Sequence, residues 1–180
     1  NLTGIGADAP EGSDQDYLPA VSVAAGTTVQ PRALGWLGIP WTAPDGELEL
    51  VPFLRPEGLR APVSIALNGA GLRNDLASGA IVYRGDVLLG AGSEIRTDAL
   101  GSIRVAGETV SAYGSLIAPG GTIALSGGRS DAFEGSQLSA KTTVYLAPGA
   151  RLSTAGTVLT QTDRFGRRVG SVLPGGTISV

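Results

Sequence analysis

The sequence contains neither cysteine nor histidine. Without cysteine the chain has no disulfide, no thiolate metal site and no cysteine nucleophile, although this does not fix the compartment. Without histidine it lacks the commonest general base and the commonest metal ligand, so a Ser-His-Asp triad is excluded. Two of the residue types most used in catalytic and metal sites are therefore missing.

Charge and helix-forming residues are also scarce. Charged residues make up 16% of the chain, below the usual quarter, and the net charge of −3 offers no basic surface for nucleic acid. Lys141 is the only lysine, methionine is absent, and no stretch is rich in Ala, Glu, Lys and Leu, so long helices are not expected. No apolar run approaches the roughly 18 residues typical of a membrane-spanning helix.

The start of the chain does not resemble a signal peptide, because no basic segment followed by an apolar one is present there. A repeated pattern continues to the last residue, Val180. We therefore expect that the chain was cut from a longer one.

Glycine is abundant, with 28 of 180 residues, which is more than twice its usual share of about 7%. Val, Ile, Thr and Ser stand between the glycines. This balance favours short strands joined by tight turns, and it predicts an all-β fold.

A short sequence motif recurs between Gly92 and Val180. Its clearest copy is Gly114–Ile117 followed by Gly121–Leu125. The apolar positions of the first halves of the copies are Ile95, Ile117, Leu138, Leu152 and Leu173, at steps of 22, 21, 14 and 21. Those of the second halves are Ile103, Ile123, Val144, Val158 and Ile178, at steps of 20, 21, 14 and 20.

The two series advance together, and a step near 21 residues suits one coil of three short strands. Successive coils would stack through parallel ladders about 4.8 Å apart, with aliphatic columns inside. The pattern therefore predicts a right-handed parallel β-helix over residues 63–180, with Gly-containing bends at Pro119–Gly121, Pro148–Gly149 and Pro174–Gly176. Asn68-Gly69 is expected to form a turn.

The step of 14 residues is too short for a full coil. Either the segment Leu138–Leu152 contains an extra hairpin, or one coil runs from Leu138 to Leu173 with an insertion. Asp163–Arg168 is the most charged part of the repeat and is expected at a hairpin tip.

Residues 1–62 are predicted to form an irregular Pro/Gly-rich excursion or cap with short strands, for example at Val21–Val29 and Glu47–Val51. Six of the eleven prolines fall between residues 31 and 62, so that segment cannot be a regular series of coil strands. Asp14 and Asp16 have the spacing of calcium ligands but lack the rest of the loop, so we interpret them as part of an acidic linker.

Five residues are candidate ligand contacts. Trp36 and Trp41 could form a carbohydrate platform, although we favour them as anchors for the excursion. Arg164, Arg167 and Arg168 could bind an anionic glycan, although a charged loop tip without a ligand is the simpler interpretation. No catalytic, cofactor or metal residue is expected.

Parallel β-helices also include polysaccharide-active enzymes, which use paired carboxylates. The acidic candidates in the coil region are Glu94, Asp98, Glu108, Asp131, Glu134 and Asp163. The positions aligned with Glu94 in the repeat are Leu116, Gln137, Arg151 and Val172. No second carboxylate aligns with Glu94, and the turn that contains Asp131 and Glu134 is interpreted as a solvated bend, so an enzyme is not expected.

The segments Gly114–Gly127 and Gly170–Val180 resemble coils of the filamentous-haemagglutinin-type exoproteins, and the resemblance covers about Gly85–Val180. Those proteins are large, secreted, right-handed β-helical adhesins of Gram-negative bacteria. The resemblance implies a location outside the cell or on its surface and export by two-partner secretion, with an outer-membrane partner. It also implies a surface glycan or protein of a host or neighbouring cell as the ligand.

We therefore expect a structural or adhesive segment, a rigid shaft that presents loops to a partner and needs no cofactor. The alternatives are a polysaccharide lyase or glycosidase and a carbohydrate-binding module on the same fold.

Overall fold

The computed structural model describes residues 1–8, 11, 17–33, 35–42, 46, 48–73, 82–128 and 143–180. These residues form strands and connecting turns, with one short 3-10 helix, η1 (Glu57–Leu59), and no α-helix. The all-β expectation is confirmed. Across the same ranges, no helix has the length and apolarity needed to cross a membrane.

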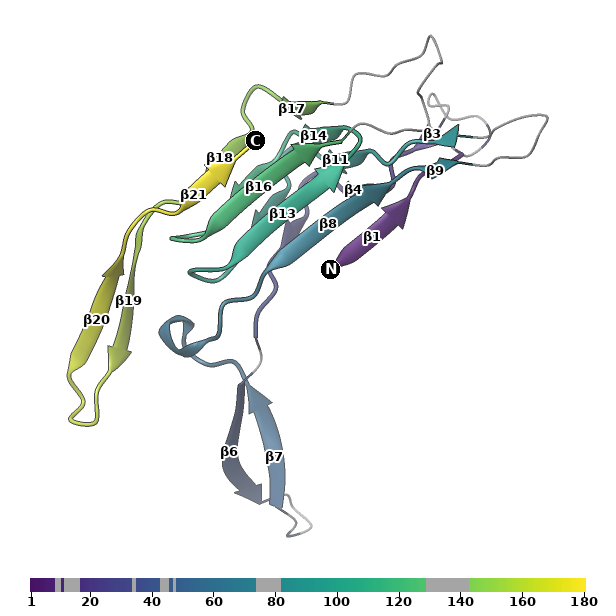
Figure 1. The fold of residues 1–180 in the computed structure, drawn as a ribbon. Helices are drawn as coiled ribbons and strands as arrows, with labels where there is room; N and C mark the ends of the chain where they lie inside the picture. The colour runs from purple at the N-terminus through teal and green to yellow at the C-terminus, as the bar shows by residue number, and fades with distance from the viewer. Residues whose placement is uncertain are drawn as a thin grey trace.

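Three parallel sheets form the body of the protein (Figure 1). Sheet 1 contains β4 (Val21–Val23), β11 (Val87–Leu89), β14 (Val110–Ala112) and β17 (Val144–Leu146). Sheet 2 contains β5 (Thr28–Val29), β12 (Glu94–Arg96), β15 (Ser115–Ile117) and β18 (Arg151–Ser153). Sheet 3 contains β1 (Leu2–Ile5), β8 (Ile65–Ala70), β13 (Ser102–Gly107), β16 (Thr122–Gly127) and β21 (Thr177–Ser179).

The chain visits the sheets in a constant order. After β1 it passes from sheet 1 to sheet 2 to sheet 3 and then returns to sheet 1. Round 1 is β4, β5 and β8, round 2 is β11, β12 and β13, round 3 is β14, β15 and β16, and round 4 is β17, β18 and β21. Each strand therefore bonds to its counterpart one round earlier or later in the chain.

The core lies between the three sheets and follows from the alternation of side chains along a strand. In β4, β11 and β14 of sheet 1 the first and third residues point inward, as Val87 and Leu89 do at 1% exposure each. In sheet 2 the middle residue points inward, as Ile95 does. The buried cluster comprises Val21, Leu67, Val87, Leu89, Ile95, Ile103, Val105, Val110, Ala112, Leu116, Ala118, Ile123 and Leu125.

The predicted stacking of the second-half apolar positions is confirmed for three residues. Ile103 pairs with Ile123, which pairs with Ile178, all in sheet 3. Val144 was expected in the same column but lies in sheet 1 opposite Val110. Val158 was expected there too, but it lies in an antiparallel hairpin opposite Val172.

The predicted first-half column is shifted by one residue. Ile95 pairs with Leu116, which pairs with Leu152, whereas Ile117 faces outward. Aligning Ile117 with Ile95 sets Gly114 on Gly92, but the bend before β12 has four residues and the bend before β15 has two. Gly114 consequently stacks on Ser93, and the alignment of Ile117 with Ile95 is wrong by one residue.

The described part of this column does not include the other two first-half positions, Leu138 and Leu173. Leu138 lies outside the described residues, and Leu173 lies in the antiparallel hairpin opposite Thr157. That hairpin is formed by β19 (Thr157–Thr162) and β20 (Arg168–Leu173), and it is inserted in round 4 between β18 and β21. Residues 163–167 form its tip and Arg168 begins β20, so the charged segment expected at a hairpin tip lies there.

Asn68-Gly69 does not form the predicted turn. Both residues lie within β8, where Gly69 pairs with Gly4 of β1. A side chain on Gly69 would overlap the carbonyl oxygen of Gly85, which lies just before β11. Position 69 therefore needs a glycine, because β8 passes very close to that part of the main chain.

The sheets extend across the boundary expected at residue 62. The strands β1, β4 and β5 all precede that residue and pair with β8, β11 and β12. Besides β19–β20, three further antiparallel pairs lie outside the three parallel sheets: β2 (Ala7–Asp8) with β3 (Tyr17–Leu18), β9 (Leu72–Arg73) with β10 (Val82–Tyr83), and β6 (Gly35–Thr42) with β7 (Leu48–Phe53).

A glycine column forms the corner between sheets 2 and 3. Gly101, Gly121 and Gly176 stand directly before β13, β16 and β21. A Cβ atom on Gly121 would overlap the carbonyl oxygen of Gly101, and one on Gly176 would overlap that of Gly121. The same two carbonyls accept hydrogen bonds from Thr122 and Thr177 of the following rounds. The ladder at this corner therefore requires residues without side chains.

We predict that Gly121→Ala lowers the free energy of unfolding by about 2–3 kcal/mol, because overpacking forces the two rounds apart. Gly175→Ala is the matched control, since its Cβ would make only an ordinary contact of 3.6 Å with the carbonyl oxygen of Thr154. Urea unfolding monitored by circular dichroism measures both. Equal stability of the two variants would contradict the glycine column.

Candidate functional site

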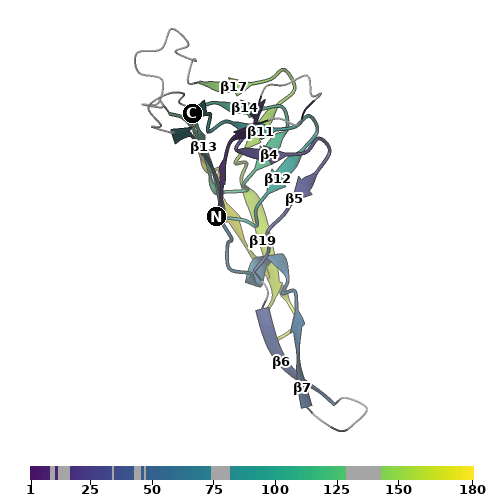
Figure 2. The ribbon, with the colours of Figure 1, turned by 90° about the vertical axis from the view of Figure 1, so that its right-hand side faces the viewer.

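Two insertions leave the sheets at the corner between sheets 2 and 3. One lies between β5 and β8 and contains the hairpin β6–β7 and η1, and the other is the hairpin β19–β20. In rounds 2 and 3 this corner is only a short turn, residues 97–101 and 118–121. Figures 1 and 2 show both hairpins projecting from this end of the sheets.

The tip of β19–β20 has a defined turn. Asp163 Oδ1 accepts hydrogen bonds from the backbone N–H groups of Phe165 and Arg167 at 2.8 and 2.9 Å. The backbone N–H of Asp163 donates to the carbonyl of Arg167, also at 2.9 Å. Gly166 adopts the left-handed conformation that this turn needs, with φ 77°. The carboxylate of Asp163 therefore holds the arginines of the tip on an ordered backbone.

Two of those arginines stack on an exposed aromatic ring. The guanidinium carbon of Arg164 lies 4.7 Å from the ring centroid of Phe165, and that of Arg167 lies 5.3 Å from it. Phe165 is 64% exposed. Cation–π contacts of this kind hold a guanidinium plane in place while its outer N–H groups stay available.

Arg168 begins β20, opposite Thr162, and is exposed. The structure thus brings together the three arginines predicted as candidate contacts. Sequence reasoning missed Phe165, although an apolar aromatic residue among arginines in a turn is a signal of an interaction surface. The tip carries three positive charges and one carboxylate, which is already engaged by backbone N–H groups.

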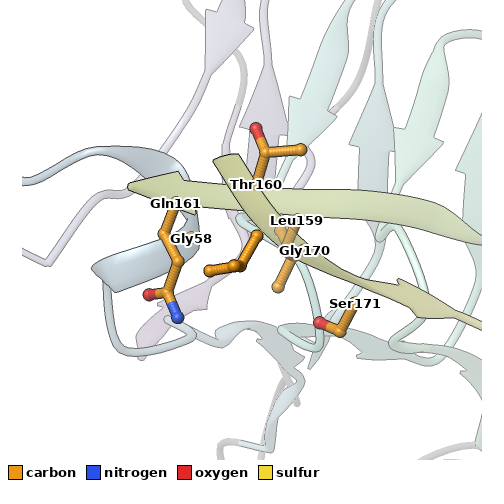
Figure 3. Close-up of a pocket in the computed structure, with 7 residues that line it drawn as sticks. Gly58, Leu159, Thr160, Gln161, Gly170 and Ser171 are labelled. Carbon is orange, nitrogen blue, oxygen red and sulfur yellow. The ribbon is translucent and has the colours of Figure 1, made fainter. Parts of the chain in front are cut away.

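A groove lies between the hairpin and η1 (Figure 3). Its volume is about 270 Å³, and its lining residues are Gly58, Leu159, Thr160, Gln161, Val169, Gly170 and Ser171. A Cβ on Gly58 would lie 3.2 Å from the carbonyl oxygen of Thr160, so η1 packs closely against β19. The hairpin is therefore supported by the first insertion and is not a free arm.

A buried ion pair fixes the first insertion to the body. Arg60, directly after η1, donates from Nε and Nη2 to the two carboxylate oxygens of Asp98 at 2.7 Å each. Asp98 lies in the round 2 corner and is 2% exposed, and Arg60 is 9% exposed. Arg60 also donates to the carbonyl of Arg55 at 2.8 Å. The chain of contacts runs from Asp98 to Arg60 to η1 to β19.

The two tryptophans lie on a different hairpin from the arginines. Trp36 and Trp41 belong to β6, opposite Pro52 and Glu49 of β7, and the register shifts between Trp36 and Pro40. The structure describes β6 and β7 through their backbone alone.

The acidic candidates are placed as follows. Glu94 stacks on Ser115 and Thr28, and Ser115 stacks on Arg151, so the expected neighbour Leu116 is wrong by one residue. Asp14, Asp16, Asp131 and Glu134 lie outside the described residues. Within the described part of the chain, no three acidic residues gather closely enough to hold a metal ion.

Comparison of the chain with models of protein families, with curated proteins and with solved structures gives no match.

We predict that Arg60→Met lowers the free energy of unfolding by about 3 kcal/mol, because it leaves the Asp98 carboxylate buried without its ion pair. Arg55→Met is the matched control, since Arg55 is exposed, and it should change stability by less than about 0.5 kcal/mol. Urea unfolding is the measurement. If Arg60→Met is as stable as the control, the ion pair does not hold the insertion.

Proposed function

We propose that this chain is a segment of a rigid shaft, built as a right-handed parallel β-helix, in a large secreted bacterial surface protein of the filamentous-haemagglutinin type. The observation that carries the proposal is the constant order of the three parallel sheets over four rounds. A parallel connection such as β13 to β16 is right-handed in nearly all known proteins, which supports the handedness.

The stacked rounds suit a mechanical role. Each round adds three short ladders and a layer of aliphatic side chains to the previous one, so stability accumulates between nearest neighbours along the axis. Ile103 and Ile123 are 1% and 0% exposed, and Val105 and Val110 are both 0% exposed. A body of this kind keeps its shape without a ligand and carries insertions at its corners.

The adhesive role is assigned to the tip of β19–β20. Its three arginines and exposed Phe165 form a cationic, partly apolar surface at the far end of a supported hairpin. Guanidinium groups recognise carboxylate and sulfate groups through paired N–H donors. The ligand is therefore an anionic glycan on a host or neighbouring cell.

A polysaccharide-active enzyme has less support. Asp98 is paired with Arg60, and Asp163 accepts two backbone N–H groups of its own turn. Both carboxylates therefore serve the structure. The secreted or cell-surface location, and export through an outer-membrane partner, follow from the sequence resemblance alone.

The binding proposal is tested with the triple variant Arg164→Gln/Arg167→Gln/Arg168→Gln and a heparin-derived oligosaccharide as the probe. We expect the wild type to bind and the triple variant to bind at least tenfold more weakly. Binding should also weaken as salt rises, because the screening length falls from about 10 Å at 0.1 M to about 3 Å at 1 M. Isothermal titration calorimetry measures both effects.

Two controls separate the alternatives. Arg104→Gln/Arg151→Gln removes exposed arginines from the outer faces of sheets 3 and 2 and should leave binding unchanged. Trp36→Ala/Trp41→Ala should also bind normally. Loss of binding in this tryptophan variant, with full binding by the triple arginine variant, would place the glycan on β6 and refute the proposed site.

A further inference from the structure

A buried glutamate lies at the opposite end of the sheet 3 strands from the two hairpins. Glu108 follows β13 directly and is 7% exposed. Its backbone N–H donates to the carbonyl of Gly85 at 2.9 Å, which fixes the main chain at this corner. The Oε2 atom is buried and has no hydrogen-bond partner among the residues that the structure describes.

Glycine makes room for this carboxyl group. A Cβ atom on Gly71, which follows β8, would overlap Oε1 of Glu108. The Glu108 carboxyl group therefore rests against the main chain of the neighbouring round. In round 3 the residue after the corresponding strand β16 is Gly128. Of the residues that follow β8, β13 and β16, Glu108 is therefore the charged one.

Arg84, a described cation that contacts Thr109 beside Glu108, is paired with another carboxylate. Arg84 donates to both carboxylate oxygens of Asp86, at 2.8 and 3.0 Å, and to Thr109 Oγ1 at 2.8 Å. No described residue forms a hydrogen bond with Oε2 of Glu108. A buried carboxylate without a partner costs the fold free energy, and such groups call for an explanation.

The carboxylate lines an open hollow of about 370 Å³ at the C-terminal ends of β8, β13 and β16 in sheet 3. The other lining residues are Asn68, Gly69, Gly71, Ala106, Gly107, Ser126 and Gly128. They supply an amide, a hydroxyl and a wall of glycine and alanine carbon atoms. Glu108 is the only formally charged residue in the described part of this lining.

We propose that this hollow binds a primary ammonium group, as carried by a lysine side chain of a protein partner. One ammonium balances the single negative charge, and its three N–H donors suit the oxygens of Glu108, Asn68 and Ser126. The two carboxylate oxygens share one charge, so a cation that contacts the group through the hollow also compensates the buried Oε2. The glycine and alanine wall accommodates the apolar stem of lysine.

A divalent cation fits the hollow less well. Calcium takes six to eight oxygen ligands and usually several carboxylates, whereas the hollow offers one carboxylate. The proposed site is separate from the hairpin tip, which binds the opposite charge, so each proposal stands or fails independently.

The test is a titration of the whole chain with Nα-acetyl-lysine methylamide, followed through the backbone amide NMR signals of Gly71, Gly107 and Gly128. We expect saturable shifts with the lysine probe and none with Nα-acetyl-norleucine methylamide, which has a similar stem and no charge. Glu108→Gln should weaken binding about tenfold or more, as expected for loss of a charged hydrogen bond. Glu94→Gln, a change on the outer face of sheet 2, should bind like the wild type.

A stability measurement completes the test without any ligand. Glu108→Gln should be at least as stable as the wild type in urea, because it removes an uncompensated buried charge. A marked loss of stability would show that the carboxylate already has an internal partner, and it would overturn the proposal. Equal binding by Glu108→Gln and the wild type, absence of saturable binding, or binding of calcium chloride in place of the lysine probe would each overturn it too.

Discussion

The structure depends on parallel rounds lying one ladder spacing apart, about 4.8 Å, in all three sheets at once. This spacing leaves no room for side chains where the chain turns from sheet 2 to sheet 3, so Gly101, Gly121 and Gly176 form a column there. It also sets each inward side chain on its counterpart, as Ile103 sits on Ile123. Register, core and corner geometry are therefore consequences of one distance.

The same constraint decides where the chain can vary. A strand cannot gain residues without losing register, whereas a corner can carry an insertion of any length that returns to the same place. Both large insertions use the corner between sheets 2 and 3, in rounds 1 and 4. The two insertions contact each other although rounds 2 and 3 lie between them in the chain, because η1 packs against β19. The first insertion is also held to round 2 by the ion pair of Arg60 with Asp98. The body thus supports a hairpin whose tip is held by Asp163 and carries the arginines.

The repeat predicted the strand content, the ladder through Ile103, Ile123 and Ile178, and the position of residues 163–167 at a tip. It fails in the first half of the repeat, where Ile117 is aligned with Ile95 although Leu116 pairs with Ile95. Gly92 and Gly114 look alike in the sequence, but bends of different length put Gly114 on Ser93. Val158 has the pattern of a coil residue, yet it pairs in an antiparallel hairpin, since alternation alone does not distinguish the two.

Contacts between distant residues could not be predicted from the sequence. Nothing local in it joins Arg60 to Asp98, and nothing marks Glu108 as buried, because both depend on which rounds are neighbours. Phe165 could be predicted from the sequence, because an aromatic residue among arginines in a turn is a signal of an interaction surface. The cation–π stacking of Arg164 and Arg167 on its ring makes it part of the same surface.

The stacking of the rounds can be measured directly with spin labels. Because the chain has no cysteine, a label attaches only where a cysteine is introduced. Ala66, Arg104, Ala124 and Ser179 are consecutive positions across sheet 3. Labels are placed pairwise on Ser179 and each of the other three, and electron paramagnetic resonance gives the distances. The account predicts distances that increase in steps of about 4.8 Å from Ala124 to Arg104 to Ala66. Distances that are irregular, or that do not increase in this order, would contradict the stacked parallel rounds.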